Sequence, residues 1–229
     1  NPRPADADRV SRMKDIKAIR GRYYIHGLIQ EGEHEHQDFK FAITDAPKIA
    51  HSISAFANND GGHLLIGVRD NGSVAGVRSD EDIYMIEQAA LMYCRPAQKV
   101  EITAFAVEAG AIVVRARIPK AEKRPVYARD TDGSWRAYFR VKDENIVAHP
   151  VMLAAWERMA RGGDTLFALS QAETALLTYL DEWGMTTVDR YMTGAHISRA
   201  TATDIVARLY AMGIIDFSYT GSEFVIVRK

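Results

Sequence analysis

Three neighbouring stretches decide the fold: Glu31-Gly-Glu-His-Glu-His-Gln-Asp-Phe-Lys40, Ser54-Ala-Phe-Ala-Asn-Asn-Asp-Gly-Gly-His-Leu-Leu-Ile-Gly-Val68 and Asp70-Asn-Gly-Ser-Val-Ala-Gly-Val77. The first is rich in carboxylates and leads into the alternating pattern of a half-buried strand. The second runs from the end of an amphipathic helix, through a double-glycine turn, into a buried apolar strand. In the third, Asn71-Gly72 predicts a tight hairpin, because this pair accepts positive φ angles. We therefore expect any chemical or ligand site to lie in this region.

The composition is that of a globular protein with a sizeable core, because 47% of the 229 residues are hydrophobic. The net charge of −1 indicates neither a nucleic-acid nor a membrane partner, so such binding must depend on local patches. The single cysteine, Cys94, lies in an apolar helical pattern and is expected to be buried. The sequence has no apolar run near the ~20 residues that span a bilayer and no signal-peptide pattern, so a cytoplasmic location is expected.

The periodicity predicts four parts along the chain. Residues 1–22 form a basic helix or arm, which is either solvated or in contact with phosphate. Residues 23–160 form an α/β domain of mixed α+β type, with strands at 39–43, 63–68, 98–108, 111–118, 125–129 and 135–142 and helices from Pro47, from Asp80 and over 149–160. Residues 161–166 form a linker, and residues 167–229 form a second, smaller domain.

The pattern changes after the linker. Leu176, Tyr179, Leu180 and Trp183 form one helical stripe, a short second helix follows near Tyr191, and a third helix is capped by a serine at 198. The chain then reads as a two-stranded ribbon over 214–227. Three helices and a β-hairpin in about sixty residues predict a winged helix, which is a variant of the helix-turn-helix.

Acidic side chains gather in the first of the quoted stretches. Glu31, Glu33, Glu35 and Asp38 lie close together, and Asp70 follows the next strand. Converging carboxylates can bind Mg²⁺ or Mn²⁺, which prefer oxygen ligands and can activate water at a phosphoryl group. The alternative is that the acids are solvated and that Asp70 serves the turn. Alternation along the strand also places Asp38 on a different face from Glu33 and Glu35.

Other ligand classes gain less support. The sequence contains no phosphate-binding loop of the Walker or dinucleotide type, and Gly61, Gly62 and Gly67 flank a strand rather than precede a helix. A turn and close backbone approach explain these glycines. His34 and His36 share a face, but without the spacing of a transition-metal site they are expected to be exposed.

A basic stretch lies between residues 115 and 142, which contains nine basic and three acidic residues with aromatic residues interleaved among them. Arg115 and Arg117 share one face of a strand, and Arg136, Tyr138 and Arg140 share a face of another. Rows of cations with aromatic side chains suit contact with a nucleic-acid backbone and stacking on bases. Solvated strand faces are the alternative explanation.

These motifs, in this order and spacing, resemble the Schlafen-AlbA-like domain, a family also described as DNA-binding or as a divergent ATP-binding domain. The resemblance covers roughly residues 20–150 and rests on Asp38-Phe39-Lys40, Ala55-Phe56-Ala57-Asn58, Gly61-Gly62, Leu65-Ile66-Gly67-Val68, Asp70, Gly72, Gly76 and Tyr138-Phe139-Arg140-Val141. It implies an α/β domain linked to nucleic acid, and bacterial members often precede a winged helix. Schlafen members include RNA-cleaving enzymes with three carboxylates, whose positions Glu33, Asp38 and Asp70 occupy here. Asp38 replaces the usual glutamate and has a shorter reach.

The leading hypothesis is a bacterial DNA-binding transcriptional regulator that is not an enzyme and needs no cofactor. Arg199, Thr201 and Thr203 would read the groove, Arg228 and Lys229 would contact phosphate, and the strand cations named above would add a second surface. We expect DNA in preference to RNA, a homodimer and no membrane partner. Residues 167–229 hold five basic and seven acidic residues, which argues against a generic DNA binder.

Two alternatives stay open. One is a metal-dependent endoribonuclease in which Glu33, Asp38 and Asp70 bind Mg²⁺ or Mn²⁺. The other is a protein-interaction or dimerisation module that binds no nucleic acid.

Overall fold

The computed structural model describes residues 16–108, 110–162 and 168–229. These residues belong to two compact units, unit 1 within 1–122 and 126–147 and unit 2 within 123–125 and 148–229. Most of the predicted basic arm and of the predicted linker lies outside the described residues. Within the described part, the first regular elements are a short strand and a helix that begins at Arg22. Among the described residues, no helix is both long and apolar enough to cross a membrane.

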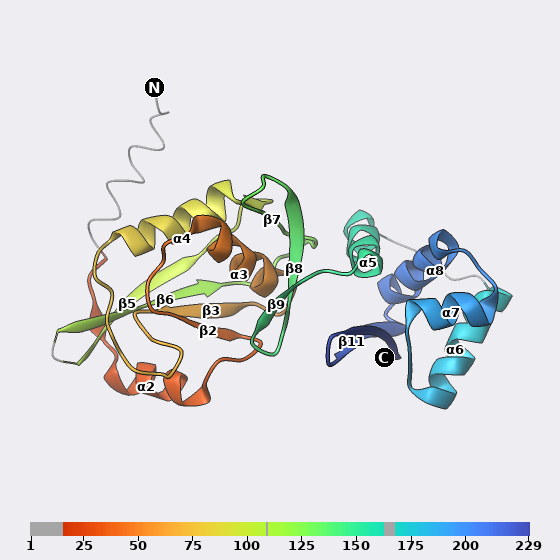
Figure 1. Ribbon diagram of the computed structural model, residues 1–229, viewed down its shortest axis with the longest axis horizontal. Helices are drawn as coiled ribbons and strands as arrows, with labels where there is room; N and C mark the ends of the chain where they lie inside the picture. The colour runs from red at the N-terminus through yellow and green to blue at the C-terminus, as the bar shows by residue number, and fades with distance from the viewer. Residues whose placement is uncertain (1–15, 109, 163–167) are drawn as a thin grey trace, which may run out of the picture. The chain divides into compact units, whose positions relative to one another are not determined.

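Unit 1 is a mixed α/β fold, as predicted (Figure 1). Its elements are β1 (Ile19–Arg20), α2 (Arg22–Glu31), β2 (Gln37–Lys40), α3 (Ala46–Asn58), β3 (Gly62–Ile66), α4 (Glu81–Met92), β4 (Cys94–Arg95), β5 (Glu101–Glu108), β6 (Ala111–Ile118), β7 (Tyr127–Arg129), β8 (Trp135–Val141) and β9 (Glu144–Val147). A five-stranded sheet has the order β1-β5-β6-β3-β2, and a four-stranded sheet has the order β4-β7-β8-β9. In the first sheet, β2 is parallel to β3 and β1 to β5, while β6 is antiparallel to both of its neighbours.

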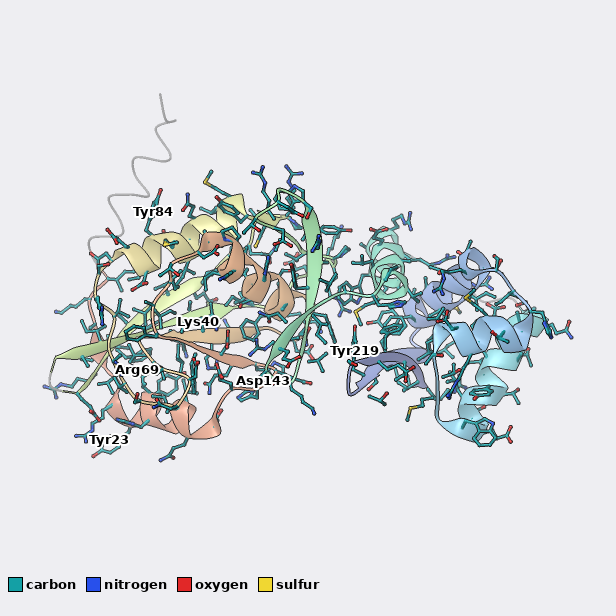
Figure 2. All side chains as sticks on the ribbon, viewed as in Figure 1. Tyr23, Lys40, Arg69, Tyr84, Asp143 and Tyr219 are labelled. Carbon is teal, nitrogen blue, oxygen red and sulfur yellow. The ribbon has the colours of Figure 1, made fainter. Side chains whose placement is uncertain are left out.

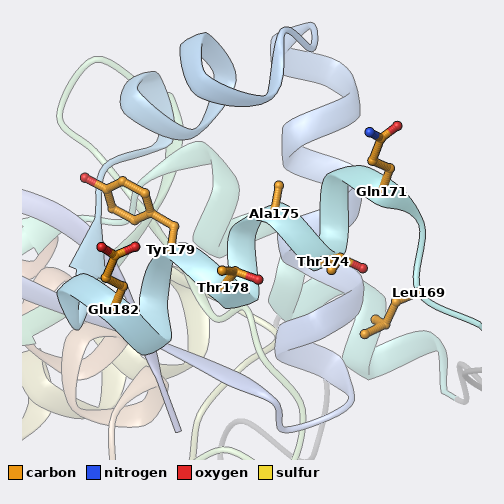
Figure 3. A pocket seen from close by; sticks show the side chains of 7 residues that line it. All are labelled: Leu169, Gln171, Thr174, Ala175, Thr178, Tyr179 and Glu182. Carbon is orange, nitrogen blue, oxygen red and sulfur yellow. The ribbon is translucent and has the colours of Figure 1, made fainter.

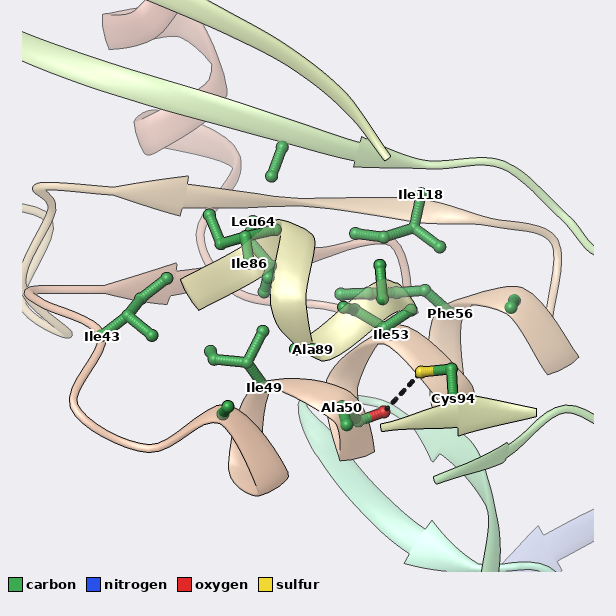
Figure 4. Close-up of a cluster of buried hydrophobic side chains, with 14 of the residues drawn as sticks. Ile43, Ile49, Ala50, Ile53, Phe56, Leu64, Ile86, Ala89, Cys94 and Ile118 are labelled. Atoms are coloured by element: carbon green, nitrogen blue, oxygen red, sulfur yellow. Dashed lines mark hydrogen bonds between the residues drawn. The ribbon is translucent and has the colours of Figure 1, made fainter. Parts of the chain in front are cut away.

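The two faces of the five-stranded sheet are covered differently. On one face, a large apolar cluster contains Ile53 and Phe56 of α3, Ile86 of α4, and Leu64 and Ile118 of the sheet (Figure 4). On the other face, a smaller cluster joins Ile25 of α2 to sheet residues and to the turn after β3. Cys94 is buried, as predicted, and its thiol lies 3.9 Å from the carbonyl oxygen of Ala50. Burial raises the pKa of this thiol to about 12, which leaves it unreactive.

Local sequence signals explain the element ends. Asp45 caps α3 by accepting a hydrogen bond from the Lys48 amide, and Pro47 occupies the first turn, as predicted. The Asn71-Gly72 turn is present, with Gly72 at φ +78°. The strand predicted over 39–43 is shifted to Gln37–Lys40, which leaves Phe41 exposed. Asp80 stands at the start of α4 but makes no capping hydrogen bond with its side chain.

Unit 2 contains four helices and a three-stranded antiparallel sheet among its described residues. They are α5 (Pro150–Arg161), α6 (Gln171–Trp183), β10 (Met185–Thr186), α7 (Val188–Ala195), α8 (Arg199–Ala211), β11 (Ile215–Thr220) and β12 (Glu223–Arg228), with the sheet order β10-β12-β11. Ser170 and Glu173 form a capping box on α6, and Ser198 caps α8. Helix α5, which the sequence grouped with the first domain, packs against α8 in unit 2.

Candidate nucleic-acid interface

One rung of polar side chains crosses the five-stranded sheet in unit 1. The strand register places Gln37 of β2 beside His63 of β3, His63 beside Arg117 of β6, and Arg117 beside Glu101 of β5. Phe39 of β2 and Leu65 of β3 lie two positions beyond Gln37 and His63, and both belong to the apolar cluster that includes Ile25 of α2. Because side chains two positions apart in a strand share a face, the polar row lies on the sheet face that α2 covers in part. The sheet therefore presents an aligned polar row beside its apolar contact with α2.

The buried amide of Gln37 fixes the orientation of His63. Its nitrogen donates hydrogen bonds to the carbonyl oxygens of Leu28 and Gly32, at 2.6 and 2.7 Å. Because both amide hydrogens are used, its oxygen accepts the hydrogen bond from Nε2 of His63, at 2.7 Å. This network assigns the proton of the neutral imidazole to Nε2 and leaves Nδ1 unprotonated.

The electrostatics at His63 are those of a positive environment. Burial is the main reason that the pKa of His63 is lowered to about 4, and the charge of Arg115 lowers it further. His34 and His36 act in the same direction, while Glu31 opposes them. His63 is therefore uncharged near neutral pH.

A shallow cleft of about 220 Å³ opens at this end of the sheet. Its lining residues come from the turn before β3, from β3 itself and from the end of β6: His36, Asp60, Gly61, Gly62, His63, Arg117, Ile118, Pro119 and Lys120. The lining thus contains two cations and two histidines against one carboxylate. The imidazole Nδ1 of His36 lies 3.0 Å from the Gly61 carbonyl oxygen, which ties the segment before β2 to the double-glycine turn.

The double glycine is required by close backbone approach. A Cβ atom on Gly62 would lie 2.3 Å from the Phe56 ring and 2.8 Å from the His36 carbonyl oxygen. Gly61 has φ +81°, which side chains disfavour, and its Cβ would meet the Ile118 carbonyl oxygen at 2.9 Å. These glycines bring the turn against the end of β6 and so create the floor of the cleft.

The two cations of the cleft are paired at the surface. Lys120 lies 2.6 Å from Asp60, and Arg117 lies 2.8 Å from Glu101. All four side chains are at least half exposed. Exposed ion pairs contribute about 0–1 kcal/mol, so a phosphate oxygen can compete with either carboxylate for the cation. The sequence did not identify His63, Asp60 or Lys120 as site residues, because their proximity depends on strand register and on the turn before β3.

Arg115 occupies the next position on the same face of β6. Its guanidinium lies over the rings of Tyr24 and Phe105, at 5.5 and 5.8 Å, and donates a hydrogen bond to the Tyr24 hydroxyl. The neighbouring Tyr23 is 90% exposed and points away from the sheet (Figure 2). The predicted pair Arg115 and Arg117 thus lies on one face with aromatic residues beside it.

The predicted row on β8 has a different environment. Arg140 is 1% exposed and donates hydrogen bonds to the carbonyl oxygens of His34 and Gln37 and to the side chain of Asn145. Tyr138 is 6% exposed and donates its hydroxyl to Asp130. These two side chains are part of the interior and are not available to a ligand.

Arg136, the third member of the β8 row, remains at the surface. It is half exposed and lies 3.4 Å from Asp130 and 3.6 Å from Asp132. Hydrogen bonds from Tyr138 and from Ser134 lower the pKa of Asp130 and of Asp132 respectively, so both carboxylates are charged. Arg136 is therefore surrounded by more negative than positive charge.

The amides at the end of α3 explain the burial of β8. The Asn59 side chain accepts a hydrogen bond from the Arg140 amide and donates one to its carbonyl, at 3.0 and 2.8 Å. Asn58 similarly binds the backbone of Val126 and Tyr138. The sequence indicated these asparagines only as the end of a helix, whereas they hold the second sheet against α3.

Of the three predicted carboxylates, Glu33 and Asp38 interact through a side-chain hydrogen bond, although alternation along the strand predicted different faces for them. The Glu33 side chain accepts a hydrogen bond from the Phe39 amide at 3.0 Å, and burial and the neighbouring Asp38 raise its pKa. Asp38 is 5% exposed, with Lys40 at 2.7 Å and Arg140 at 3.6 Å. Asp70 is exposed in the turn after β3. Among the described residues, no group of three His, Cys, Asp or Glu side chains is arranged to hold a metal ion.

In unit 2, the predicted groove-reading residues lie at the start of α8. Thr201 is exposed, and its hydroxyl lies 2.9 Å from that of Ser198. Arg199 is exposed and pairs with Asp189 of α7. Thr203 is half-buried and lines a hollow of about 580 Å³ between α5 and α8, together with Ala154, Arg158, Arg161, Arg199, Ala200, Asp204 and Ala207. This lining holds three arginines and one carboxylate.

The two predicted phosphate contacts at the chain end lie on the sheet of unit 2. Arg228 of β12 is 3.3 Å from Asp181 of α6, and both side chains are exposed. Lys229 follows β12 and is exposed. Both residues are accessible to a ligand, but neither lines the hollow beside α8.

Residues 33–149, about half of the chain, match the family described as Schlafen, AlbA_2, and the chain belongs to this family. No curated protein matches the chain. Among solved structures, the DIP2311 protein from Corynebacterium diphtheriae resembles it with 22% identity and a TM-score of 0.42, over 83% of this chain. The match covers 34% of the Corynebacterium protein, so this chain spans about a third of its length.

A second solved structure is the N-terminal domain of a protein from Nitrosomonas europaea that is named as related to the ATP-dependent DNA helicase RecG. It shares 18% identity with a TM-score of 0.40, over 67% of this chain and 96% of that domain.

Proposed function

We propose that this protein binds nucleic acid and acts as a DNA-binding transcriptional regulator. The observation that carries the proposal is that each unit has a hollow with an excess of cationic over acidic side chains, although the whole chain is slightly acidic. Local positive charge of this kind attracts the phosphate backbone irrespective of sequence. Membership of the Schlafen, AlbA_2 family adds support for a function related to nucleic acid.

Unit 2 is proposed to be a winged helix. The order α6, β10, α7, α8, β11, β12 is that of a winged helix-turn-helix, in which the third helix enters the major groove and the final hairpin is the wing. In this assignment α8 is the recognition helix, and its exposed first turn presents Arg199 and Thr201. Thr203 is less accessible, because it faces the hollow beside α5.

Unit 1 is proposed to contact backbone phosphate through the cleft at the end of β3 and β6. Arg117 and Lys120 would exchange their exposed carboxylate partners for phosphate oxygens. The β8 row is left out of this interface, because Tyr138 and Arg140 are internal and Arg136 lies between two carboxylates.

The test is the equilibrium binding of the full chain to labelled duplex DNA, single-stranded DNA and tRNA at increasing salt, with and without Mn²⁺. The proposal predicts binding to duplex DNA whose affinity falls steeply with salt, without cleavage. Substituting Arg199→Ala should weaken binding and reduce the salt slope by about one unit for the lost phosphate contact. Lys48→Ala is the control, because Lys48 is 78% exposed on α3 and lines neither the cleft of unit 1 nor the hollow beside α8.

Three results would contradict the proposal. Cleavage that requires Mn²⁺ and is lost in Asp70→Ala would favour the three-carboxylate nuclease instead. Absence of binding to all three nucleic acids at low salt would favour a protein-interaction module. Equal loss of binding in Arg199→Ala and Lys48→Ala would remove α8 from the interface.

A further inference from the structure

Helix α6 has an exposed face that nothing in unit 2 covers among the described residues. Its buried side carries Leu176, Leu177 and Leu180. The opposite side borders a shallow groove of about 550 Å³, lined by Leu169, Gln171, Thr174, Ala175, Thr178, Tyr179 and Glu182 (Figure 3). These helical positions recur every three or four residues, so they form one continuous stripe along α6.

Large apolar side chains are exposed around this stripe. Trp183 is 63% exposed, Met185 45%, Leu169 40% and Tyr179 37%. Single exposed apolar residues are ordinary on a protein surface, but a group at and around one helix marks an interaction surface. The middle of the stripe, by contrast, has only the small side chains of Ala175 and Thr178, which allow another helix to approach closely.

The stripe is complementary to itself in an antiparallel arrangement. A two-fold axis through the middle of α6, between residues 176 and 177, brings Ala175 opposite Thr178 of the partner subunit. The same axis brings Thr174 opposite Tyr179 of the partner subunit, and Gln171 opposite Glu182 of the partner subunit. Each contact occurs twice, as in the isologous interface of a two-fold dimer.

Charge favours the same arrangement. Glu182 lies in the last turn of α6, where its carboxylate meets the negative end of its own helix dipole. In the antiparallel pair it faces the N-terminal turn of the partner helix, whose dipole end is positive, and the Gln171 amide can donate a hydrogen bond to it. The antiparallel arrangement also places Trp183 of one copy at the same end of the helix pair as Leu169 of the partner subunit.

We propose that α6 forms the interface of a symmetric homodimer, in which the α6 helices of two copies pack antiparallel through this stripe. The proposal does not depend on nucleic-acid binding, because it concerns only contacts between two copies of the chain. In this dimer Trp183 becomes buried, and the small side chains of Ala175 and Thr178 at the centre allow the two helices to approach closely.

The test is sedimentation velocity of the full chain over a wide concentration range, without nucleic acid. The wild-type protein should sediment as a dimer, and Thr178→Glu should sediment as a monomer, because each copy would bury a charged carboxylate against Ala175 of the partner subunit. The matched control is Thr193→Glu on α7, which makes the same change at another exposed helical threonine and should leave the dimer intact.

A second measurement guards against a variant that fails to fold. Oxidation of a double variant with Ala175→Cys and Thr178→Cys should link two chains by disulfides, since residue 175 lies opposite residue 178 of the partner subunit, and the native Cys94 is buried. Thr193→Cys should remain unlinked. A wild-type monomer at all concentrations, a Thr178→Glu dimer, or equal linking of the two cysteine variants would overturn the proposal. None of these outcomes bears on whether the protein binds nucleic acid.

Discussion

The cationic rows of β6 and β8 look alike in sequence but have opposite environments in the structure. Arg117 of β6 is half exposed and lines an open cleft, whereas Arg140 of β8 is 1% exposed and binds two backbone carbonyls. The difference arises from what packs against each strand. The end of β6 lies beyond the part of the sheet that α2 covers, while β8 is held against α3 by Asn58 and Asn59. A cation in a strand therefore indicates a binding surface only when the packing of that strand is known.

The largest expected effect separates the two arginines by stability. Arg140→Ala should lower the free energy of unfolding by about 3–5 kcal/mol, because the carbonyl oxygens of His34 and Gln37 and the Asn145 side chain lose buried hydrogen bonds, and Asp38 loses one of its two cationic neighbours. Arg117→Ala should lower it by less than about 1 kcal/mol, since its ion pair is exposed. Urea denaturation of both variants measures the difference, and similar losses would mean that the two rows do not differ as described.

A smaller effect is expected at the asparagine that holds β8. Asn58→Ala should cost about 2–4 kcal/mol, because backbone groups of Val126 and Tyr138 lose buried hydrogen bonds. Asn71→Ala is the control, since Asn71 is exposed and accepts a single hydrogen bond from the Ser73 amide in a turn. Thermal unfolding compares the two variants. An Asn58→Ala protein as stable as the control would show that these amides do not hold the second sheet.

The next effect concerns the pH dependence of stability that arises from His63, which lies on β3 beside Arg117 of β6. The pKa of His63 in the folded protein, about 4, is below its ordinary value of 6.5, so the unfolded chain binds this proton more readily. The contribution of His63 to stability should therefore be fully present above pH 6.5 and be lost as the pH falls towards 4. Comparing the wild type with His63→Gln over this range isolates it. Identical pH profiles of unfolding would contradict a depressed pKa.

The smallest expected effect is the contribution of Arg115 to the lowered pKa of His63. Arg115→Ala should raise the pKa of His63 only part of the way towards its ordinary value, because burial is the larger cause. NMR titration of the imidazole measures this directly. A pKa unchanged by the substitution would mean that Arg115 adds no positive field at the cleft.

Periodicity and turn chemistry were enough to predict most elements of the fold. The α3 helix with Pro47, the buried strand after the double glycine and the cap of α8 at Ser198 follow from local rules. The short strands β1, β4, β9 and β10 were not predicted, because two to four residues carry no measurable period, and helix α2 was not predicted either. The sequence also gave no sign that α5 packs on α8, since the affiliation of a helix depends on contacts distant in the chain.

The site was less predictable than the fold. Arg115 and Arg117 were identified because alternation along the strand places them on one face. In the structure both lie on the sheet face that α2 covers in part. His63 and Lys120 were missed, because their proximity depends on strand register, which one sequence does not reveal. The three carboxylates were grouped by the resemblance to the Schlafen enzymes; in the structure Glu33 and Asp38 interact, whereas Asp70 is exposed in the turn after β3.

The most direct test compares Arg117→Ala with Arg136→Ala. Both arginines are about half exposed and both are paired with carboxylates, but only Arg117 lines the cleft. The binding of labelled duplex DNA to each variant should be measured by fluorescence anisotropy from about 50 to about 200 mM salt. The account predicts that Arg117→Ala lowers the affinity and reduces the salt slope by about one unit, while Arg136→Ala keeps the wild-type slope. Equal slopes in the two variants, or a loss confined to Arg136→Ala, would contradict it.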